Sequence, residues 1–272
     1  MLKSSFSRIA TATLGATALA FSVAPGANAA RAQEDVPTFQ EFKAATFQDV
    51  GGQYVVNGDE TIATTNELRA YYEQMVNSRD TDSQSLVVNT VGGADDVWSA
   101  SQAQNLTYCV SDDFGADKSA MVSAMQSGAG QWEAASSGVT FTYVPSADAN
   151  CTVSNSAVLF SVEPIETSQY IARAFFPSSP SSQQNVLVDD SIWTSGSWTP
   201  SNIIAHELGH VLGFRHEHTR PEAGTCFEDS NWRPLTPYDS ASIMHYPQCN
   251  GSSSDLSMTD TDRQGVASVY GS

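Results

Sequence analysis

The residues most able to do chemistry lie in one short segment, 206–216, which reads H-E-L-G-H-V-L-G-F-R-H. His206 and His210 are four residues apart, so on a helix they share one face and can aim their imidazoles at one metal ion. Gly213 can adopt a left-handed backbone conformation that ends the helix and brings His216 round as a third ligand. Three protein ligands with one open position are typical of catalytic zinc, so the segment predicts one Zn²⁺ as cofactor.

Glu207 completes the chemistry that this segment predicts. It follows His206 directly, so it projects about 100° around the helix axis from it, beside a zinc-bound water rather than on the metal. Zinc lowers the pKa of such a water from about 15.7 to about 7. Glu207 can then take the proton as general base and pass it to a leaving amine, which is the chemistry of peptide-bond hydrolysis.

The rest of the chain is predicted to fold into helices and strands around this motif. Thr199 is a suitable N-cap and Pro200 suits a first helical turn, so the histidine-bearing helix is expected over 199–212. The N-G pair at 57–58 predicts a hairpin turn, and the polar stretch 77–96 is typical of a linker. Further helices are expected over 66–76, 117–135 and 260–270, and strands over 105–110, 139–144, 157–162, 171–176 and 185–189.

The chain has 272 residues and is predicted to hold three regions. Lys3, Arg8, an apolar run over 9–23 and an A-x-A pattern at 27–29 predict a secretory signal peptide over 1–29. The apolar run is too short for a transmembrane anchor, so the protein is expected to be secreted, without membrane insertion. Residues 30–100 form an N-terminal region that could serve as a prosegment, and residues 101–272 form the zinc-binding domain.

The charge and the cysteines restrict the partners and the compartment. A formal net charge of −18 argues against a basic groove for nucleic acid and against an anionic membrane surface, and a monomer is expected. Four cysteines in a secreted chain predict two disulfides, and three pairings are possible. Because each pair then stays within one half of the protein, we expect Cys109 to pair with Cys151 and Cys226 with Cys249.

At this point the sequence resembles the metzincin zinc peptidases. Their second signature is a methionine turn beneath the metal, which segment 242–246, S-I-M-H-Y, resembles with Met244 as the turn methionine. The extended form at 213–218, G-F-R-H-E-H, and the same S-I-M-H-Y segment are similar to astacins. This resemblance implies that Tyr246 is a further zinc ligand that helps to stabilise the transition state, and that Glu217 contacts the N-terminus of a processed enzyme.

Over 200–272 the chain also looks like the secreted myxobacterial-type dual-action metallopeptidases. The segments 220–222, 232–239 and 246–251 carry that similarity, which is weaker before residue 200. The implied fold is α+β and metzincin-like. It comprises a twisted mixed five-stranded sheet with two long helices, a backing helix and a zinc-binding helix, over a small loop-rich C-terminal subdomain that ends in a helix. An extended peptide would pair with an edge strand over 171–176.

Segment 56–59, V-N-G-D, allows two interpretations. It resembles the F-x-G-D segment of astacin prosegments, with Val in place of Phe, which implies that Asp59 caps the zinc of a zymogen until proteolysis removes it. The same residues suit a hairpin turn, which is the interpretation that the sequence favours.

Two functions remain open on the sequence alone. The first is a secreted zinc endopeptidase acting on protein or peptide substrates. The second is a catalytically inert zinc-containing protein that binds a peptide or a cell-wall component. Glu207, which such inert proteins usually lack, favours the enzyme.

Overall fold

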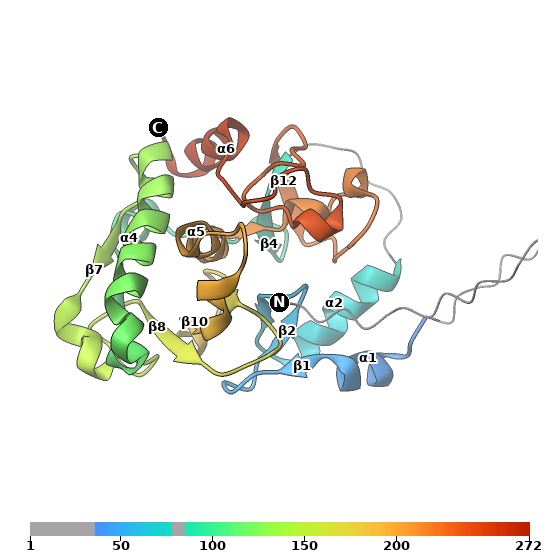
Figure 1. The fold of residues 1–272 in the computed structure, drawn as a ribbon. Coiled ribbons are helices and arrows are strands. Elements are labelled where there is room, and N and C mark those ends of the chain that lie inside the picture. Colours follow the sequence, from blue (N-terminus) through green and yellow to red (C-terminus); the bar gives the residue numbers. More distant parts are fainter. Residues whose placement is uncertain (1–35, 78–84) are drawn as a thin grey trace, which may run out of the picture.

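The computed structural model describes residues 36–77 and 85–272 of the chain. The expected signal peptide over 1–29 lies outside the described residues. Figure 1 shows a small N-terminal unit, residues 36–77, packed against a larger body, residues 85–272.

A mixed five-stranded sheet forms one layer of the body. Four of its strands are parallel, and β9, at one edge, runs antiparallel to β10. Its central strands are apolar and buried, because the sheet is covered on both faces. In spatial order the strands are β7 (Phe141–Tyr143), β6 (Leu106–Val110), β8 (Phe160–Ile165), β10 (Asn185–Asp189) and β9 (Ala172–Arg173).

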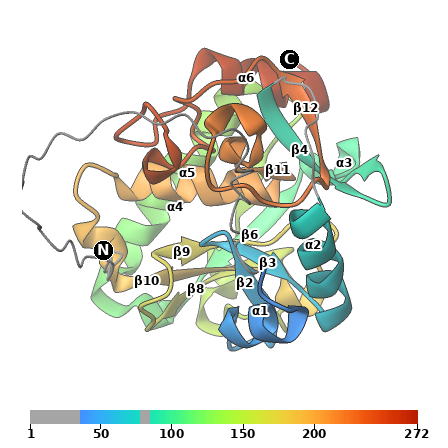
Figure 2. The same ribbon diagram turned by 90° about the vertical axis from the view of Figure 1, so that its right-hand side faces the viewer.

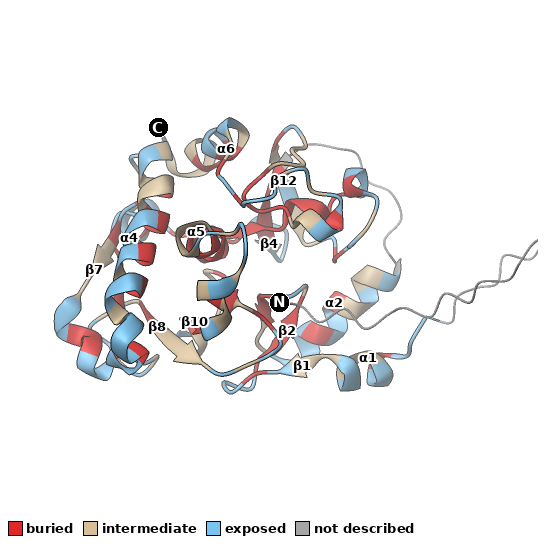
Figure 3. Ribbon diagram, viewed as in Figure 1, coloured by how far each residue is buried: buried red, intermediate tan, exposed pale blue. Residues whose placement is uncertain are grey.

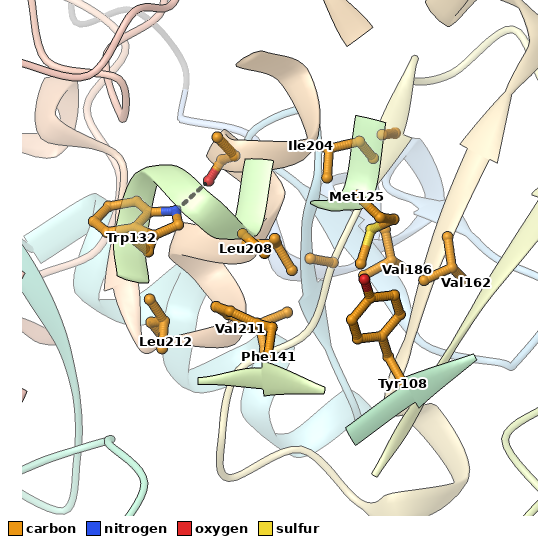
Figure 4. Packing of buried hydrophobic residues seen from close by; sticks show 14 of the residues in the cluster. Tyr108, Met125, Trp132, Phe141, Val162, Val186, Ile204, Leu208, Val211 and Leu212 are labelled. Atoms are coloured by element: carbon orange, nitrogen blue, oxygen red, sulfur yellow. Dashed lines mark hydrogen bonds between the residues drawn. The ribbon is translucent and has the colours of Figure 1, made fainter. Parts of the chain in front are cut away.

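Two long helices, α4 (Lys118–Ala135) and α5 (Pro200–Val211), pack on one face of this sheet. Figure 3 shows that α4 turns its buried residues toward α5 and exposes its other face. The helices approach closely at Gly128, where a Cβ would lie 2.9 Å from the backbone nitrogen of Ala205. Trp132 donates its indole N–H to the Ala205 carbonyl at 2.7 Å within the apolar core (Figure 4). The backing helix and the histidine-bearing helix are therefore fixed to each other and to the sheet.

A second sheet links distant parts of the body. β4 (Ser85–Val91) pairs on one side with β11 (Phe214–Arg215) and on the other with β12 (Trp232–Thr236), and β5 (Ala94–Asp95) extends β4 as a hairpin. The prediction of a linker over 77–96 is therefore wrong where β4 and β5 lie. β4 forms because its apolar residues find partners more than a hundred residues away, which the local sequence does not reveal.

The C-terminal part of the body is rich in turns and ends in α6 (Asp260–Tyr270), which Thr259 caps. A short helix, α3 (Ala100–Ala103), precedes β6. Disulfides join Cys109 to Cys151 and Cys226 to Cys249, the two pairs that the sequence favoured. Among the described residues, no helix has the length and apolar character needed to cross a bilayer.

The N-terminal unit is a three-stranded sheet with two helices and a small core of its own. Its turn at 57–59 joins β2 to β3, so the hairpin expected around Asn57 and Gly58 is confirmed. Figure 2 shows β2 and β3 beside β9, at the open side of the body below α5. In chain order its elements are α1 (Phe39–Ala45), β1 (Phe47–Gln48), β2 (Tyr54–Val56), β3 (Glu60–Ile62) and α2 (Thr65–Asn77).

The α+β fold agrees with the sequence-based expectation: a mixed five-stranded sheet, two long helices and a turn-rich C-terminal part that ends in a helix. The expected strands and helices all form, although the strand expected over 171–176 is reduced to the two residues of β9. The expected domain boundary at residue 100 stays a prediction. β4 lies on its N-terminal side and pairs with strands of the C-terminal half.

Candidate metal centre

Helix α5 carries the motif and ends where the third histidine must turn back. Thr199 accepts a hydrogen bond from the Asn202 backbone at 3.2 Å, and Pro200 occupies the first turn, which needs no N–H. At the other end, Gly213 has a φ of 94° and a Cβ there would lie 2.1 Å from the Asp96 carbonyl oxygen. Only glycine fits this position, and its conformation directs the chain toward His216.

Each of the three motif histidines uses its Nδ1 to hold its ring in place. His206 Nδ1 lies 2.7 Å from the Ile243 carbonyl oxygen, and His210 Nδ1 lies 2.8 Å from that of Phe214. His216 Nδ1 lies 2.8 Å from a carboxylate oxygen of Glu228. Because these acceptors fix the proton on Nδ1, the lone pair of each ring is on Nε2, the atom left to bind a metal.

The three Nε2 atoms converge with the carboxylate of Asp59 from the N-terminal unit. Their ligand atoms all lie within 4.8 Å of one another, and Nε2 of His206 is 3.3 Å from Nε2 of His216. Asp59 lies 3.2 Å from His206, 3.1 Å from His216 and 3.5 Å from His210, measured to each Nε2. Nitrogen lone pairs and a carboxylate that face one another in a buried site repel unless a cation lies between them. This donor set fits Zn²⁺, which prefers nitrogen and oxygen ligands.

Glu207 lies beside this centre and contributes no atom to the converging set. Its Oε2 is buried and has no hydrogen-bond partner among the described residues. Burial, and after it the negative charge of Asp59, raises the pKa of Glu207 well above its usual value. Burial lowers the pKa of His206 to about 4, which keeps that imidazole neutral, as a metal ligand must be.

Tyr246 and Met244 bound the centre on its other sides. The Tyr246 ring stacks on His206 with centroids 5.3 Å apart, and its hydroxyl donates to Asp59. Burial, and after it the Asp59 charge, raises the pKa of Tyr246 well above its usual value, so the hydroxyl keeps its proton. Met244 is fully buried against α5, where a Cβ on Gly209 would lie 2.4 Å from its sulfur. Both residues thus lie beside the three histidines.

Asp59 lies both in a hairpin turn and beside the three histidines. It ends the hairpin turn that the sequence favoured, and the same turn points its carboxylate at the three histidines. Turn geometry and metal approach are therefore not alternatives here.

Two charged residues at the centre escaped the sequence analysis. Glu228 accepts a hydrogen bond from His216 Nδ1 and lies 3.4 Å from His218 Nε2. Arg215, the neighbour of His216, is buried and paired with Glu228, Asp229 and Glu60. No local motif marks Glu228, because only the loop that carries it brings it near His216. The one signal in the sequence was that Arg215 directly precedes the histidine at 216.

Glu217, which the astacin resemblance linked to a processed N-terminus, has an internal environment in this structure. Its Oε1 accepts the Asp239 backbone N–H at 3.1 Å and lies 3.6 Å from Arg220 Nη1. Glu217 therefore pairs with Arg220.

A cavity of 350 Å³ adjoins the metal-binding residues. His206, Glu207 and Tyr246 line it on one side, and apolar residues including Trp198 and Leu256 line it elsewhere. The turn at 57–59 also lines this cavity, so the N-terminal unit reaches into the space next to the histidines. The arrangement has a metal site, an adjacent carboxylate and room for a ligand, all covered by the N-terminal unit.

Comparisons with known proteins agree with this geometry. The peptidase family model described as Matrixin matches residues 97–223. High choriolytic enzyme 2 of Oryzias latipes is 40% identical over 63 aligned positions, which cover 17% of this chain and 22% of that protein. The bone morphogenetic protein 1 homolog of Strongylocentrotus purpuratus is 40% identical over 63 positions, which cover 16% of this chain and 10% of that protein.

The chain thus spans less than a quarter of the length of these curated relatives. A solved structure of myroilysin matches 64% of this chain and 95% of its own, at 19% identity and a TM-score of 0.45.

The matrixin match covers α5 and all three histidines, and the relatives include enzymes named as zinc metalloproteinases, such as nas-39 of Caenorhabditis elegans. Together with the converging imidazoles and the methionine turn, these matches show that the chain is similar to matrixin-type and astacin-like metallopeptidases over the segment that carries the histidines.

Proposed function

We propose that this protein is a secreted zinc-dependent endopeptidase, made as a zymogen, in which Glu207 is the general base. The observation that carries the proposal is the convergence of three buried Nε2 atoms beside Glu207, whose buried Oε2 has no hydrogen-bond partner within the described residues. His206, His210 and His216 would hold the zinc ion. Zinc bound there supplies Lewis-acid chemistry, which lowers the pKa of water and polarises a carbonyl.

The chain's own residues supply the remaining steps. Glu207 takes the proton of the attacking water on its carboxylate and passes it to the leaving amine. Tyr246 carries a protonated hydroxyl that donates to Asp59 in the full chain and to the developing oxyanion once Asp59 has left. The apolar cavity beside Glu207 excludes water and holds a side chain of a protein or peptide substrate.

The test compares wild type with Glu207→Gln in cleavage of casein after limited proteolysis of the secreted protein. We expect chelator-sensitive cleavage by wild type and a loss of at least about a hundredfold in the variant, because a general base contributes roughly 10²–10⁴-fold. Bound zinc, measured in the same samples, should stay at one ion per chain in both. A wild type that binds zinc and cleaves nothing would favour the inert binding protein instead.

Asp59 is proposed as the residue that keeps the full chain latent. Its carboxylate lies between the histidines, and its unit is held to the body by the buried pairs of Asp49 with Arg173 and of Glu60 with Arg215. Residues 30–100 would then include the prosegment, which follows the signal peptide proposed for 1–29. Secretion fits the two disulfides, which persist in oxidising compartments.

Asp59→Asn in the full chain tests this latency. The neutral amide is a weaker ligand, so we expect casein cleavage by the unprocessed variant to rise at least about tenfold over unprocessed wild type. Glu67→Gln is the matched control, because it removes a charge from the same unit at an exposed position on α2. An unprocessed wild type that is already as active as the processed protein would contradict the zymogen.

A further inference from the structure

Arg173 lies on the edge strand β9 and is completely buried. Its Nη1 donates to the backbone and side-chain oxygens of Asn185, at 2.9 and 2.7 Å. Its Nε donates to Asp49 at 2.7 Å. With the amide of Gln53 oriented so that its oxygen faces the guanidinium, Nη2 donates to that oxygen at 2.7 Å. All three nitrogens of the guanidinium therefore donate hydrogen bonds in the full chain.

The partners of Arg173 fall into two groups. Asn185 belongs to the body, whereas Asp49 and Gln53 belong to the N-terminal unit. Among the ion pairs of residues 36–77 and 85–272, Asp49 is the only carboxylate within 4.0 Å of Arg173. Departure of the N-terminal unit would remove the carboxylate partner of this cation.

Arg215, another buried arginine, would keep carboxylate partners after the N-terminal unit leaves. Arg215 also pairs with the N-terminal unit, through Glu60, yet the body itself supplies Glu228 and Asp229. Its charge stays balanced when the unit leaves, and that of Arg173 does not. An arginine fork that loses a carboxylate presents donors with the geometry to bind another one.

The place of Arg173 on β9 puts that fork beside an extended substrate. β9 pairs with β10 on one side, and no strand of the five-stranded sheet pairs with its other side. Ala172, its neighbour, lines the cavity that contains His206 and Glu207. A peptide added along β9 would project alternate side chains to the two faces of the sheet.

The face matters, because it decides which substrate side chains Arg173 can reach. Arg173 lies opposite Leu187 in the β9–β10 pair, and Leu187 packs with Tyr170 and Val55 rather than with the core beneath the helices. Side chains of an added strand that point to this face lie about 5 Å from their lateral neighbours. A substrate carboxylate on this face would reach the position that Asp49 occupies.

We propose that Arg173 is a specificity-determining residue that binds the carboxylate of an aspartate or glutamate side chain of the substrate, and that Asp49 occupies its place in the full chain. This inference rests on the proposed endopeptidase function and on removal of the N-terminal unit.

The test uses the full chain activated by limited proteolysis and pairs of quenched fluorescent peptides. Within a pair, one position carries Asp or Asn, or Glu or Gln, and successive pairs scan the positions around the cleaved bond. We expect wild type to favour the acidic member at one position by about tenfold or more in kcat/KM, as a charge-assisted hydrogen bond provides. In Arg173→Gln the two members should be cleaved within about twofold of each other.

Arg233→Gln is the control, because Arg233 is an exposed arginine that pairs with Asp95 on the surface. It should retain the acidic preference that Arg173→Gln loses. An acidic preference that survives in Arg173→Gln, or a neutral profile in active wild type, would overturn the inference alone. No cleavage of either member by wild type would overturn the proposed function and this inference with it.

If Arg173→Gln fails to fold, a second measurement on the wild-type protein still tests the proposal. The cleavage sites of the activated protein in denatured casein can be enumerated by mass spectrometry. Acidic residues should be enriched at one position on the scale of the peptide preference. Their absence from every position would overturn the proposal.

Discussion

The carboxylate of Glu228 decides how firmly the third histidine is held. His206 and His210 lie on one helix and donate to backbone carbonyls, so the backbone fixes both rings. His216 lies beyond the helix and depends on a side chain, Glu228, at 2.8 Å. Such outer carboxylates orient a ligand and raise its basicity.

Glu228→Gln should therefore lower zinc affinity by about 10–100-fold, the usual loss when a partner of a metal ligand is replaced. Competition with a chromophoric chelator on the activated protein measures this affinity. Glu166→Gln, an isosteric change at an exposed position, should leave the affinity unchanged. Equal affinities in Glu228→Gln and wild type would show that the loop carrying Glu228 only packs against His216.

At the residue scale the sequence predicted the residues with local spacing and missed those brought in by tertiary structure. His206, Glu207 and His210 share one helix, so helical geometry was enough to predict their relation. Glu228 and the Asp49 partner of Arg173 come from loops and from a separate unit. Their positions depend on packing that no short-range pattern encodes.

At the scale of elements, the packing of α5 depends on two glycines at positions where a side chain would collide with neighbouring atoms. Gly128 admits α5 against α4, and Gly209 admits the sulfur of Met244 beneath the histidine-bearing turns. A Cβ on Gly209 would also lie 3.1 Å from the Trp132 ring, so the methyl group meets neighbours on two sides.

Gly209→Ala should lower the free energy of unfolding by about 1–3 kcal/mol, because overpacking a core forces its neighbours to shift. Gly130→Ala is the matched control, since a Cβ there meets nothing within 4 Å on α4. The control should raise stability by about 0.5–1 kcal/mol through backbone entropy. Thermal unfolding of both variants and wild type measures the difference, and equal shifts in the two variants would contradict close packing at Gly209.

The elements themselves were predictable to different degrees. Helices α2 and α4 follow from their apolar period, and the caps Thr199 and Thr259 mark the starts of α5 and α6. β4 was missed because Gly92 and Gly93, which turn β4 into β5, have the composition of a linker. Its partners β11 and β12 lie far along the chain, so its strand character depends on contacts outside any local window.

At the scale of the whole molecule, the N-terminal unit and the body enclose one buried centre. Asp59 reaches the histidines, Thr61 donates to the Ala174 carbonyl at 3.2 Å, and Gln74 donates to Asn231 at 3.0 Å. His206, His210 and His216 are each no more than 1% exposed beneath it. The unit therefore contributes a carboxylate to the converging atoms and also covers them.

These two contributions predict how zinc leaves the protein. A chelator should strip zinc from the activated protein at least about ten times faster than from the full chain, a difference of about 1.4 kcal/mol. Stopped-flow absorbance with a chromophoric chelator gives both rates. Asp59→Asn in the full chain separates the two causes, because it keeps the N-terminal unit in place and weakens its contact with the metal. Zinc release from this variant at the rate of the full-length wild type would assign the protection to burial. Release near the rate of the activated protein would assign it to the carboxylate. Equal rates from full chain and activated wild type would contradict a metal centre covered by residues 36–77.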